Sequence, residues 1–258
     1  MNTLRAGWII TQRDLLHWVR QPWTPIFSLL FSVVLLLIFG LLFGGAIDVP
    51  GGGYIDFLLP GMLALTMMFG VETTTSAMAN DAKKGITDRF RSMPIGSASV
   101  ALGRVGADMA NSAVELAVLI GGGLLIGWRI TGDAGSAALA VLLLLALRFA
   151  LLWVGVYLGL AFKGDSTTMA VQTLIWPVGF LSTVFVSAET MPGWLAAVTV
   201  WNPVSATATA VRELFGNPTG ATSGVLADHA VALAIGWPIL ITAVFLPLSA
   251  YAYRKLRS

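Results

Sequence analysis

Charged residues are scarce in this sequence, and cysteine is absent from it. Aspartate, glutamate, lysine and arginine make up 11% of the 258 residues, against 57% hydrophobic residues. Soluble proteins carry roughly a quarter of charged residues, so this composition predicts an all-α integral membrane protein. The lack of cysteine excludes disulfides and cysteine metal sites. A net charge of +2 is too small to indicate nucleic acid as a partner.

The sequence also lacks the motifs of nucleotide and catalytic sites. It has no G-x-x-x-x-G-K-[ST] motif, and the order of residues at 163–167 (KGDST) does not match one. It has no H-E-x-x-H motif, and neither His17 nor His229 has a nearby cysteine or a cluster of acids at metal-ligand spacing. We therefore predict no catalytic residue, no metal site and no cofactor in this chain. A pump without a nucleotide site of its own needs a partner that has one.

Long apolar runs dominate what is present. A membrane-spanning helix needs roughly 20 apolar residues, and the chain offers six such runs. We expect spans at residues 26–44, 57–79, 107–128, 136–162, 168–188 and 229–253. In the fifth run, Pro177 frees a backbone carbonyl, which then needs a neighbour in the membrane.

Residues 1–22 precede these runs and have a different pattern. Apolar residues recur at three- and four-residue spacing, and basic residues fall opposite them: Leu4, Trp8, Thr11, Leu15 and Trp18 against Arg13, His17 and Arg20. This pattern predicts an amphipathic helix that lies in the membrane interface.

One long polar interval, residues 80–105, separates the second and third runs. It carries five basic and two acidic residues in NDAKKGITDRFRSMPIGSASVALGRV. The stretch from Asp81 to Met93 contains no proline and can form a short helix, which Pro94 ends. Two interpretations are open: a charged helix presented to a soluble partner, or a solvated loop whose basic residues only set the orientation of the chain.

The motif in this interval favours the first interpretation. Gly85-x-x-Asp88-Arg89-Phe90-Arg91-Ser92-Met93-Pro94, followed by Gly103-Arg104, resembles the cytoplasmic signature loop of ABC-2 type transporter permeases, above all those of the daunorubicin-resistance type. Lys84 stands where many members of the wider superfamily have glutamate. The resemblance implies a coupling helix that docks on a separate ATPase subunit through Asp81, Lys84, Gly85, Asp88, Arg89, Phe90, Arg91 and Pro94.

The resemblance also implies the assembly and its cargo. It covers nearly the whole chain and implies a single transmembrane domain over residues 1–258. Two such permeases, as a homodimer, would work with two ATPase copies that bind ATP and Mg in the cell membrane, in contact with its lipids. The substrate would be an amphipathic drug, antibiotic or lipid-like molecule.

Residues 189–205 form a second distinctive stretch. Its apolar piece, residues 194–201, is too short to span, and turn signals lie on both sides at Pro192-Gly193 and Asn202-Pro203. We expect a re-entrant hairpin in the outer leaflet, and the stretch resembles the extracellular re-entrant segment of the same permeases. Trp194 and Trp201 are either interface anchors or part of a substrate exit path.

Three ionisable residues fall within the apolar runs: Glu72, Glu115 and Arg148. An arginine at mid-membrane costs roughly 2.5–3.5 kcal/mol on insertion scales, so it needs a partner. We predict an Arg148–Glu115 pair, with Arg148–Glu72 as the second choice. Such a pair either fastens helices only or takes part in transport.

The distribution of basic residues predicts the orientation. With a cytoplasmic N-terminus, 12 of the 15 lysines and arginines lie inside and two, Arg129 and Arg212, lie outside. Both termini and the signature loop are then cytoplasmic. The leading interpretation is the permease subunit of an ABC exporter. The alternatives are a self-sufficient secondary transporter or channel, for which we see no internal repeat, and a membrane-embedded enzyme.

Overall fold

The computed structural model describes residues 23–43, 49, 52–83, 97–162 and 165–255. Across these residues the chain is helical, apart from connecting segments and an isolated β-bridge between Val49 and Gly52. The predicted all-α architecture is therefore confirmed for the described part of the chain. The expected interfacial helix at residues 1–22 lies outside it, as do residues 84–96 of the signature loop.

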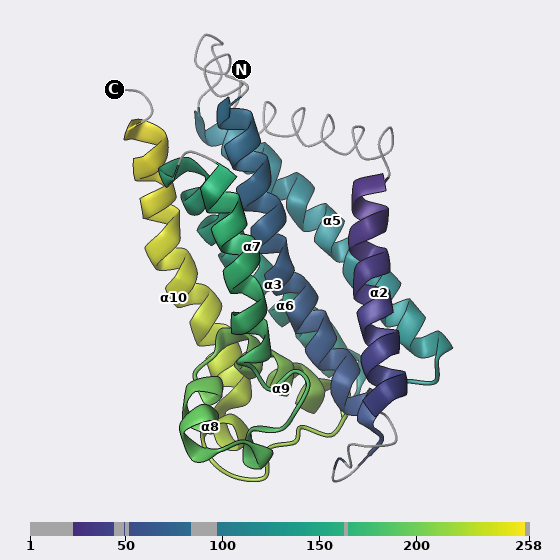
Figure 1. Cartoon of the computed structure of the whole chain (residues 1–258). Coiled ribbons are helices and arrows are strands. Elements are labelled where there is room, and N and C mark those ends of the chain that lie inside the picture. The colour runs from purple at the N-terminus through teal and green to yellow at the C-terminus, as the bar shows by residue number, and fades with distance from the viewer. Residues whose placement is uncertain (1–22, 44–48, 50–51, 84–96, 163–164, 256–258) are drawn as a thin grey trace.

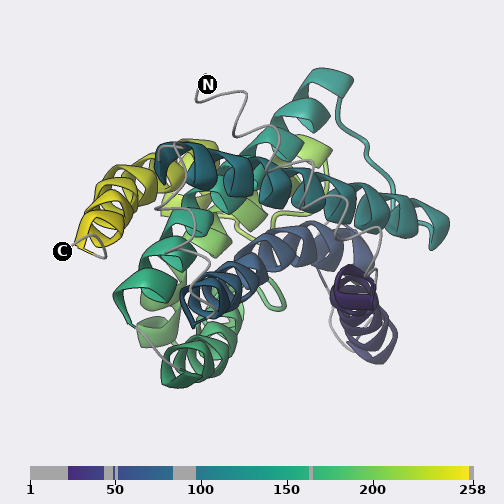
Figure 2. The same cartoon turned by 90° about the horizontal axis from the view of Figure 1, so that it is seen from above.

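Within the described residues, six helices of 16 residues or more run in alternating directions along a bundle (Figure 1). They are α2 (Trp23–Phe43), α3 (Tyr54–Lys83), α5 (Ser97–Leu125), α6 (Ala134–Ala161), α7 (Asp165–Phe180) and α10 (Val225–Lys255). Seen along the bundle, α2 and α10 occupy opposite sides, with α3 and α6 between them (Figure 2).

Four of these helices are long and apolar enough to cross a membrane. Judged by length and composition over the described residues, they are Tyr54–Asp81, Val105–Leu125, Ala134–Ala161 and Val225–Ala252. The chain is therefore a multi-pass membrane protein. The apolar stretch described in α2 is shorter, Leu30–Leu42.

The expected fifth span differs from the observed helix. We expected it to reach residue 188, whereas α7 ends at Phe180 and residues 181–187 are irregular. Pro177 lies inside the last turn of α7. Because proline has no N–H and its ring clashes with the preceding turn, a helix is easily ended close to it.

α3 and α6 form the centre of the bundle. In α3, 78% of the most apolar window is buried, against 11% in α10. A Cβ atom added at Gly155 or Gly159 of α6 would lie 2.9 Å from Val71 O or 2.8 Å from Thr75 O of α3. Only glycine permits this approach, so the four-residue glycine spacing packs two helices of the same chain.

Residues 188–224 cap the end of the bundle opposite to the end of α10 (Figure 1). The cap contains the 3-10 helix η1 (Ala188–Thr190), α8 (Gly193–Val200) and α9 (Pro203–Phe215). Asn202 accepts a hydrogen bond from Val204 N–H at the start of α9, and its amide donates to Val178 O and Leu181 O at 2.9 and 2.7 Å. The turn predicted at Asn202-Pro203 thus satisfies carbonyls at the end of α7.

Candidate functional site

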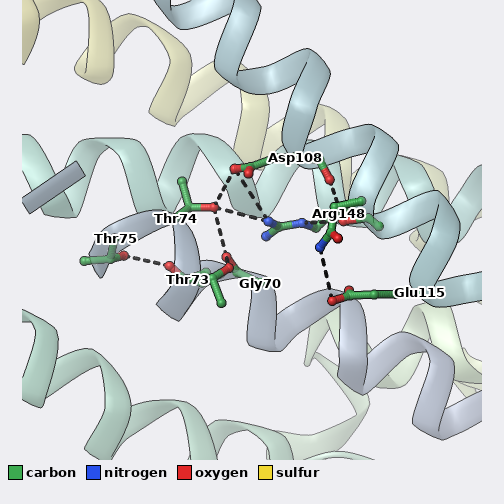
Figure 3. A network of polar contacts seen from close by, with 10 residues as sticks. Gly70, Thr73, Thr74, Thr75, Asp108, Glu115 and Arg148 are labelled. Carbon is green, nitrogen blue, oxygen red and sulfur yellow. Dashed lines mark hydrogen bonds and ion pairs between the residues drawn. The ribbon is translucent and has the colours of Figure 1, made fainter. Parts of the chain in front are cut away.

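Arg148 lies where α3, α5 and α6 meet (Figure 3). Its Nε donates to Ser112 Oγ at 3.0 Å, and its Nη2 donates to Thr74 Oγ1 at 3.2 Å. The same Nη2 lies 3.8 Å from Asp108 Oδ2, which makes an ion pair. Arg148 is 3% exposed, so this charge is held inside the protein by groups from two other helices.

Thr74 and Ser112 extend this arrangement into a network. Thr74 Oγ1 lies 3.0 Å from both Asp108 Oδ2 and Gly70 O, so its single proton can go to either oxygen. Ser112 Oγ donates to Asp108 O at 2.9 Å while it accepts from Arg148. Each hydroxyl therefore accepts a hydrogen bond from the guanidinium and donates one to a neighbouring oxygen.

Gly70 makes room for the guanidinium. A Cβ atom at this position would lie 1.9 Å from Arg148 Nη1 and 2.1 Å from Cζ. Within the described part of the chain, Nη1 is buried without a hydrogen-bond acceptor. The guanidinium thus lies flat against the backbone of α3, and no residue larger than glycine fits beneath it.

The ion pair recorded for Arg148 differs from the two that we ranked. Asp108 forms the ion pair with Arg148, because it lies one helical turn before Ser112 on α5 and both side chains face α6. Glu115, the first choice, is buried further along α5 and accepts a hydrogen bond from Asn111 Nδ2 at 3.2 Å. A direct contribution of Glu115 to Arg148 stays a prediction.

Glu72, the second choice, accepts a hydrogen bond from α7 and not from Arg148 of α6. Gln172 Nε2 of α7 donates to Glu72 Oε1 at 2.6 Å. Glu72 is half-buried and Gln172 is exposed. The three ionisable residues that the sequence singled out are therefore not gathered at one point. The guanidinium of Arg148, from α6, packs against the inner face of α3, whereas Glu72 lies on a face of α3 that is open to the outside of the chain.

Arg212 is a second buried arginine, and sequence reasoning missed it. We counted it among the outside charges, but it is 0% exposed. Its Nε donates to Phe57 O at 2.7 Å, its Nη2 donates to Thr183 O and Val184 O at 3.0 Å each, and its guanidinium lies 3.5 Å from the centre of the Phe57 ring. Burial lowers the pKa of Arg212 to about 9, which leaves it protonated at pH 7.

This arginine holds the irregular segment 181–187 onto α3. The carbonyls that it binds have no helical donors, because α7 has already ended. A signal for its burial was present in the run of small residues before it, SATATA at 205–210. All of those residues are buried, which indicates close packing of α9.

The two tryptophans of the predicted re-entrant segment lie at the surface of the cap. Trp194, at the start of α8, is 72% exposed, and Trp201, just after its end, is 58% exposed. Both positions fit contact with lipid or with cargo, and their roles stay predictions.

The described residues that flank the predicted docking segment lie at the other end of the bundle. α3 ends at Lys83, three residues into the predicted coupling segment, with Asp81 in its last turn. α5 begins at Ser97, at the same end of the bundle as the end of α10 (Figure 1). The remaining docking residues, Lys84, Gly85, Asp88, Arg89, Phe90, Arg91 and Pro94, lie outside the described residues.

Comparison of the sequence with known proteins assigns the chain to a family. The profile of the family described as ABC-2 type transporter matches residues 5–215. The chain is 32% identical over 227 residues to the daunorubicin resistance ABC transporter permease protein DrrB1 of Streptomyces coeruleorubidus, which covers 88% of this chain and 78% of that protein. It is 24% identical over 250 residues to the probable doxorubicin resistance ABC transporter permease protein DrrC of Mycobacterium tuberculosis, covering 88% and 86%. It is 22% identical over 254 residues to the putative transport permease ycf38 of Cyanophora paradoxa, covering 96% and 87%.

Proposed function

Because the chain belongs to the ABC-2 type transporter family, we propose that it exports an amphipathic drug, antibiotic or lipid-like molecule through the membrane. It is a permease subunit, and permeases of this family work with ABC ATPase subunits. The names of two relatives refer to resistance to daunorubicin and doxorubicin. These names support the proposed class of cargo.

The observation that carries the proposal is the position of Arg148 relative to the signature loop. α3 enters this loop and α5 leaves it, and Arg148 of α6 binds both helices. Thr74 lies nine residues before the end of α3 at Lys83, or about 14 Å along the helix. A force on the loop is therefore transmitted to α3, α5 and α6 as one connected body.

The mechanism follows from that connection. Closure of an ATPase pair on ATP and Mg would press on the two coupling segments, at Asp81 and residues 84–94 of each permease. The helices joined at Arg148 would then move together and open a path between two copies of this chain. In this scheme ATP hydrolysis belongs to the separate subunit, and this chain has no nucleotide site.

The proposal also includes the orientation of the chain in the membrane. Both termini and the signature loop face the cytoplasm, and α8 with Trp194 and Trp201 forms the re-entrant part of the outer cap. α2, with 21 helical residues, and α7 are the two remaining spans, and α7, which ends at Phe180, is helical over part of the bilayer only. Residues 1–22 lie in the inner interface as an amphipathic helix.

Co-purification with an ATPase subunit tests this function. The chain is expressed with a candidate ABC ATPase and captured, and ATP hydrolysis by the complex is measured. We expect a stable complex that is lost in the double variant Asp88→Ala, Arg89→Ala, because these residues would form the docking surface. Glu213→Gln is the matched control: it alters an exposed charge in the cap, at the other end of the bundle, and should leave the complex intact.

Each result has one meaning. A complex that survives the double variant would move the docking contact away from Asp88 and Arg89. A chain that forms no complex with any ABC ATPase would overturn the proposed function.

A further inference from the structure

The ends of three helices enclose a cavity at the cap end of the bundle. The end of α2, the start of α3 and the turn after α5 lie side by side there (Figure 1 and Figure 2). The cavity has a volume of about 430 Å³ and is lined by Gly40 and Leu41 of α2, residues 53–56 at the start of α3, and residues 126–128 after α5. Small-molecule sites have volumes of about 300–1,000 Å³, so the cavity has room for a ligand.

The cavity lies at the level where the apolar stretches of these helices end. The apolar stretch of α2 ends at Leu42, the candidate span of α3 begins at Tyr54, and that of α5 ends at Leu125. Three helices thus enter or leave the hydrocarbon together. Lipid headgroups lie directly outside the hydrocarbon core of a bilayer. A ligand in the cavity is therefore at the level of the headgroups.

The membrane side of the cavity is an open apolar groove. Leu41 of α2 is 77% exposed and Leu125 of α5 is 89% exposed. Gly127 turns the chain after α5 with a φ of 105°, and a Cβ atom there would meet nothing within 4 Å. The groove therefore leads from the cavity toward the hydrocarbon, and an acyl chain can lie along it.

Two opposite charges lie at the cavity end of this groove. Asp56 lines the cavity, and its Oδ2 accepts a hydrogen bond from Gly53 N–H at 3.3 Å. Arg129 directly follows the lining residue Trp128, and its Nη1 donates to Leu124 O and Trp128 O at 2.6 and 2.8 Å. Among the described residues neither charge forms an ion pair. Each charge is therefore available to an opposite charge on a ligand.

The charges and the groove together match one class of lipid. Phosphatidylethanolamine carries a primary ammonium and an anionic phosphate close together, above its acyl chains. An ammonium has three N–H donors for a carboxylate, and a guanidinium donates to a phosphate. The quaternary ammonium of phosphatidylcholine has no N–H, and phosphatidylglycerol has no cation. Of these three lipids, only phosphatidylethanolamine satisfies both charges.

We propose that the cavity binds one phosphatidylethanolamine molecule from the leaflet at the cap. Its ammonium lies at Asp56, its phosphate lies at Arg129, and an acyl chain follows Leu41 and Leu125 along the groove. Because α2, α3 and α5 all contribute to the site, the lipid fixes the three helices to one another at this end of the bundle. The lipid stays with the protein and is not exported cargo, so the site does not depend on the proposed function.

Lipids with increasing methylation of the headgroup nitrogen test the site. The full chain is purified in detergent and titrated with phosphatidylethanolamine, its N-methyl and N,N-dimethyl derivatives, and phosphatidylcholine, all with the same acyl chains. Bound lipid is counted by native mass spectrometry. We expect the affinity to fall by about tenfold over the series, with the largest step at the loss of the last N–H, because a charge-assisted hydrogen bond to Asp56 is then lost.

Two variants assign the charges separately. Asp56→Asn keeps an oxygen that can accept from Gly53 N–H but removes the charge, so it should bind phosphatidylethanolamine and phosphatidylcholine equally. Arg129→Gln should weaken the binding of both lipids by a similar factor, since both carry the phosphate. Glu213→Gln is the matched control, because it alters an exposed carboxylate outside the cavity. It should leave the whole series unchanged.

Three results would overturn the site. The first is equal binding of all four lipids by the wild-type chain, which would make the bound molecules ordinary surrounding lipid. The second is an ethanolamine preference that survives Asp56→Asn, or binding that is unchanged in Arg129→Gln. The third is separation of two permease copies by either variant, because the groove would then be an interface between copies. No step uses an ATPase, so these results leave the export function untouched.

Discussion

Arg148 and Gly70 are complementary residues on facing helices. The guanidinium is buried, and it keeps its partners Thr74, Ser112 and Asp108 only because α3 has no side chain at position 70. A buried charge that loses its partners is costly. The fit at this point therefore determines whether the network forms at all.

A methyl group at position 70 tests this fit. We expect Gly70→Ala to displace the guanidinium and to lower the free energy of unfolding by roughly 1–3 kcal/mol. Unfolding is measured in detergent micelles. Gly121→Ala is the matched control, because a Cβ atom there meets nothing within 4 Å. In an Arg148→Met background the cost of Gly70→Ala should fall. An equal cost for the two alanine variants would contradict the argument.

At the scale of an element, Asp133 determines where α6 begins. Its carboxylate accepts hydrogen bonds from Gly135 N at 2.8 Å, Ser136 N at 3.1 Å and Ser136 Oγ at 2.7 Å. These satisfy donors that the first turn of a helix leaves open. The hydrogen bonds from the Ser136 side chain, Ser136 N–H and Gly135 N–H lower the pKa of Asp133.

The lowered pKa of Asp133 predicts a pH dependence of stability. A carboxyl group whose pKa is lower in the folded state stabilises the fold above its unfolded pKa of about 3.9, and this contribution is lost as the pH falls through the folded pKa. The midpoint of thermal unfolding is therefore compared at pH 7 and below pH ~4. The unfolding midpoint of the wild type should exceed that of Asp133→Ala by less at low pH than at pH 7. The difference between Asp133→Asn and Asp133→Ala should not change, because asparagine caps without titrating. If the midpoints of the wild type and Asp133→Ala differ by the same amount at both pH values, the charge of Asp133 does not stabilise the helix start.

At the scale of the whole molecule, the alternating helices place two different structures at the two ends. The ends of α3 and α10 and the starts of α5 and α7 lie at one end, and the cap of residues 188–224 lies at the other (Figure 1). α3 and α5, which the signature loop joins in the sequence, end and begin at the first end, and we propose from the positive-inside rule that this end faces the cytoplasm.

Single cysteines test this orientation directly, since the natural chain contains none. Ser223 lies exposed in the cap, and Ser166 lies exposed at the start of α7. We expect Ser223→Cys to react with a membrane-impermeant maleimide in intact cells and Ser166→Cys to react only after permeabilisation. Reaction of both in denaturant shows that both variants are present. The reverse pattern would invert the proposed topology.

The long helices could be predicted because a membrane span is a local property of about 20 consecutive residues. The turns at Pro192-Gly193 and Asn202-Pro203 were accessible for the same reason, since glycine, proline and asparagine act on their own backbone. The choice of Asp108 at Arg148 was not accessible. Spacing places Asp108 and Glu115 on α5, but the rotation of α5 against α6 selects between them.

The sequence by itself determined the class of the protein, the number of its long apolar runs and the one polar interval suited to a soluble partner. Hydropathy, charge and motif act through near neighbours in the chain, so they can be read without a fold. Only the tertiary structure decided that α7 ends at Phe180, that Arg212 is buried, and that the ends of α2, α3 and α5 enclose a cavity. Each of these depends on groups far apart in sequence, such as Arg212 and the Thr183 carbonyl, which are separated by 29 positions. Packing alone brings such groups together.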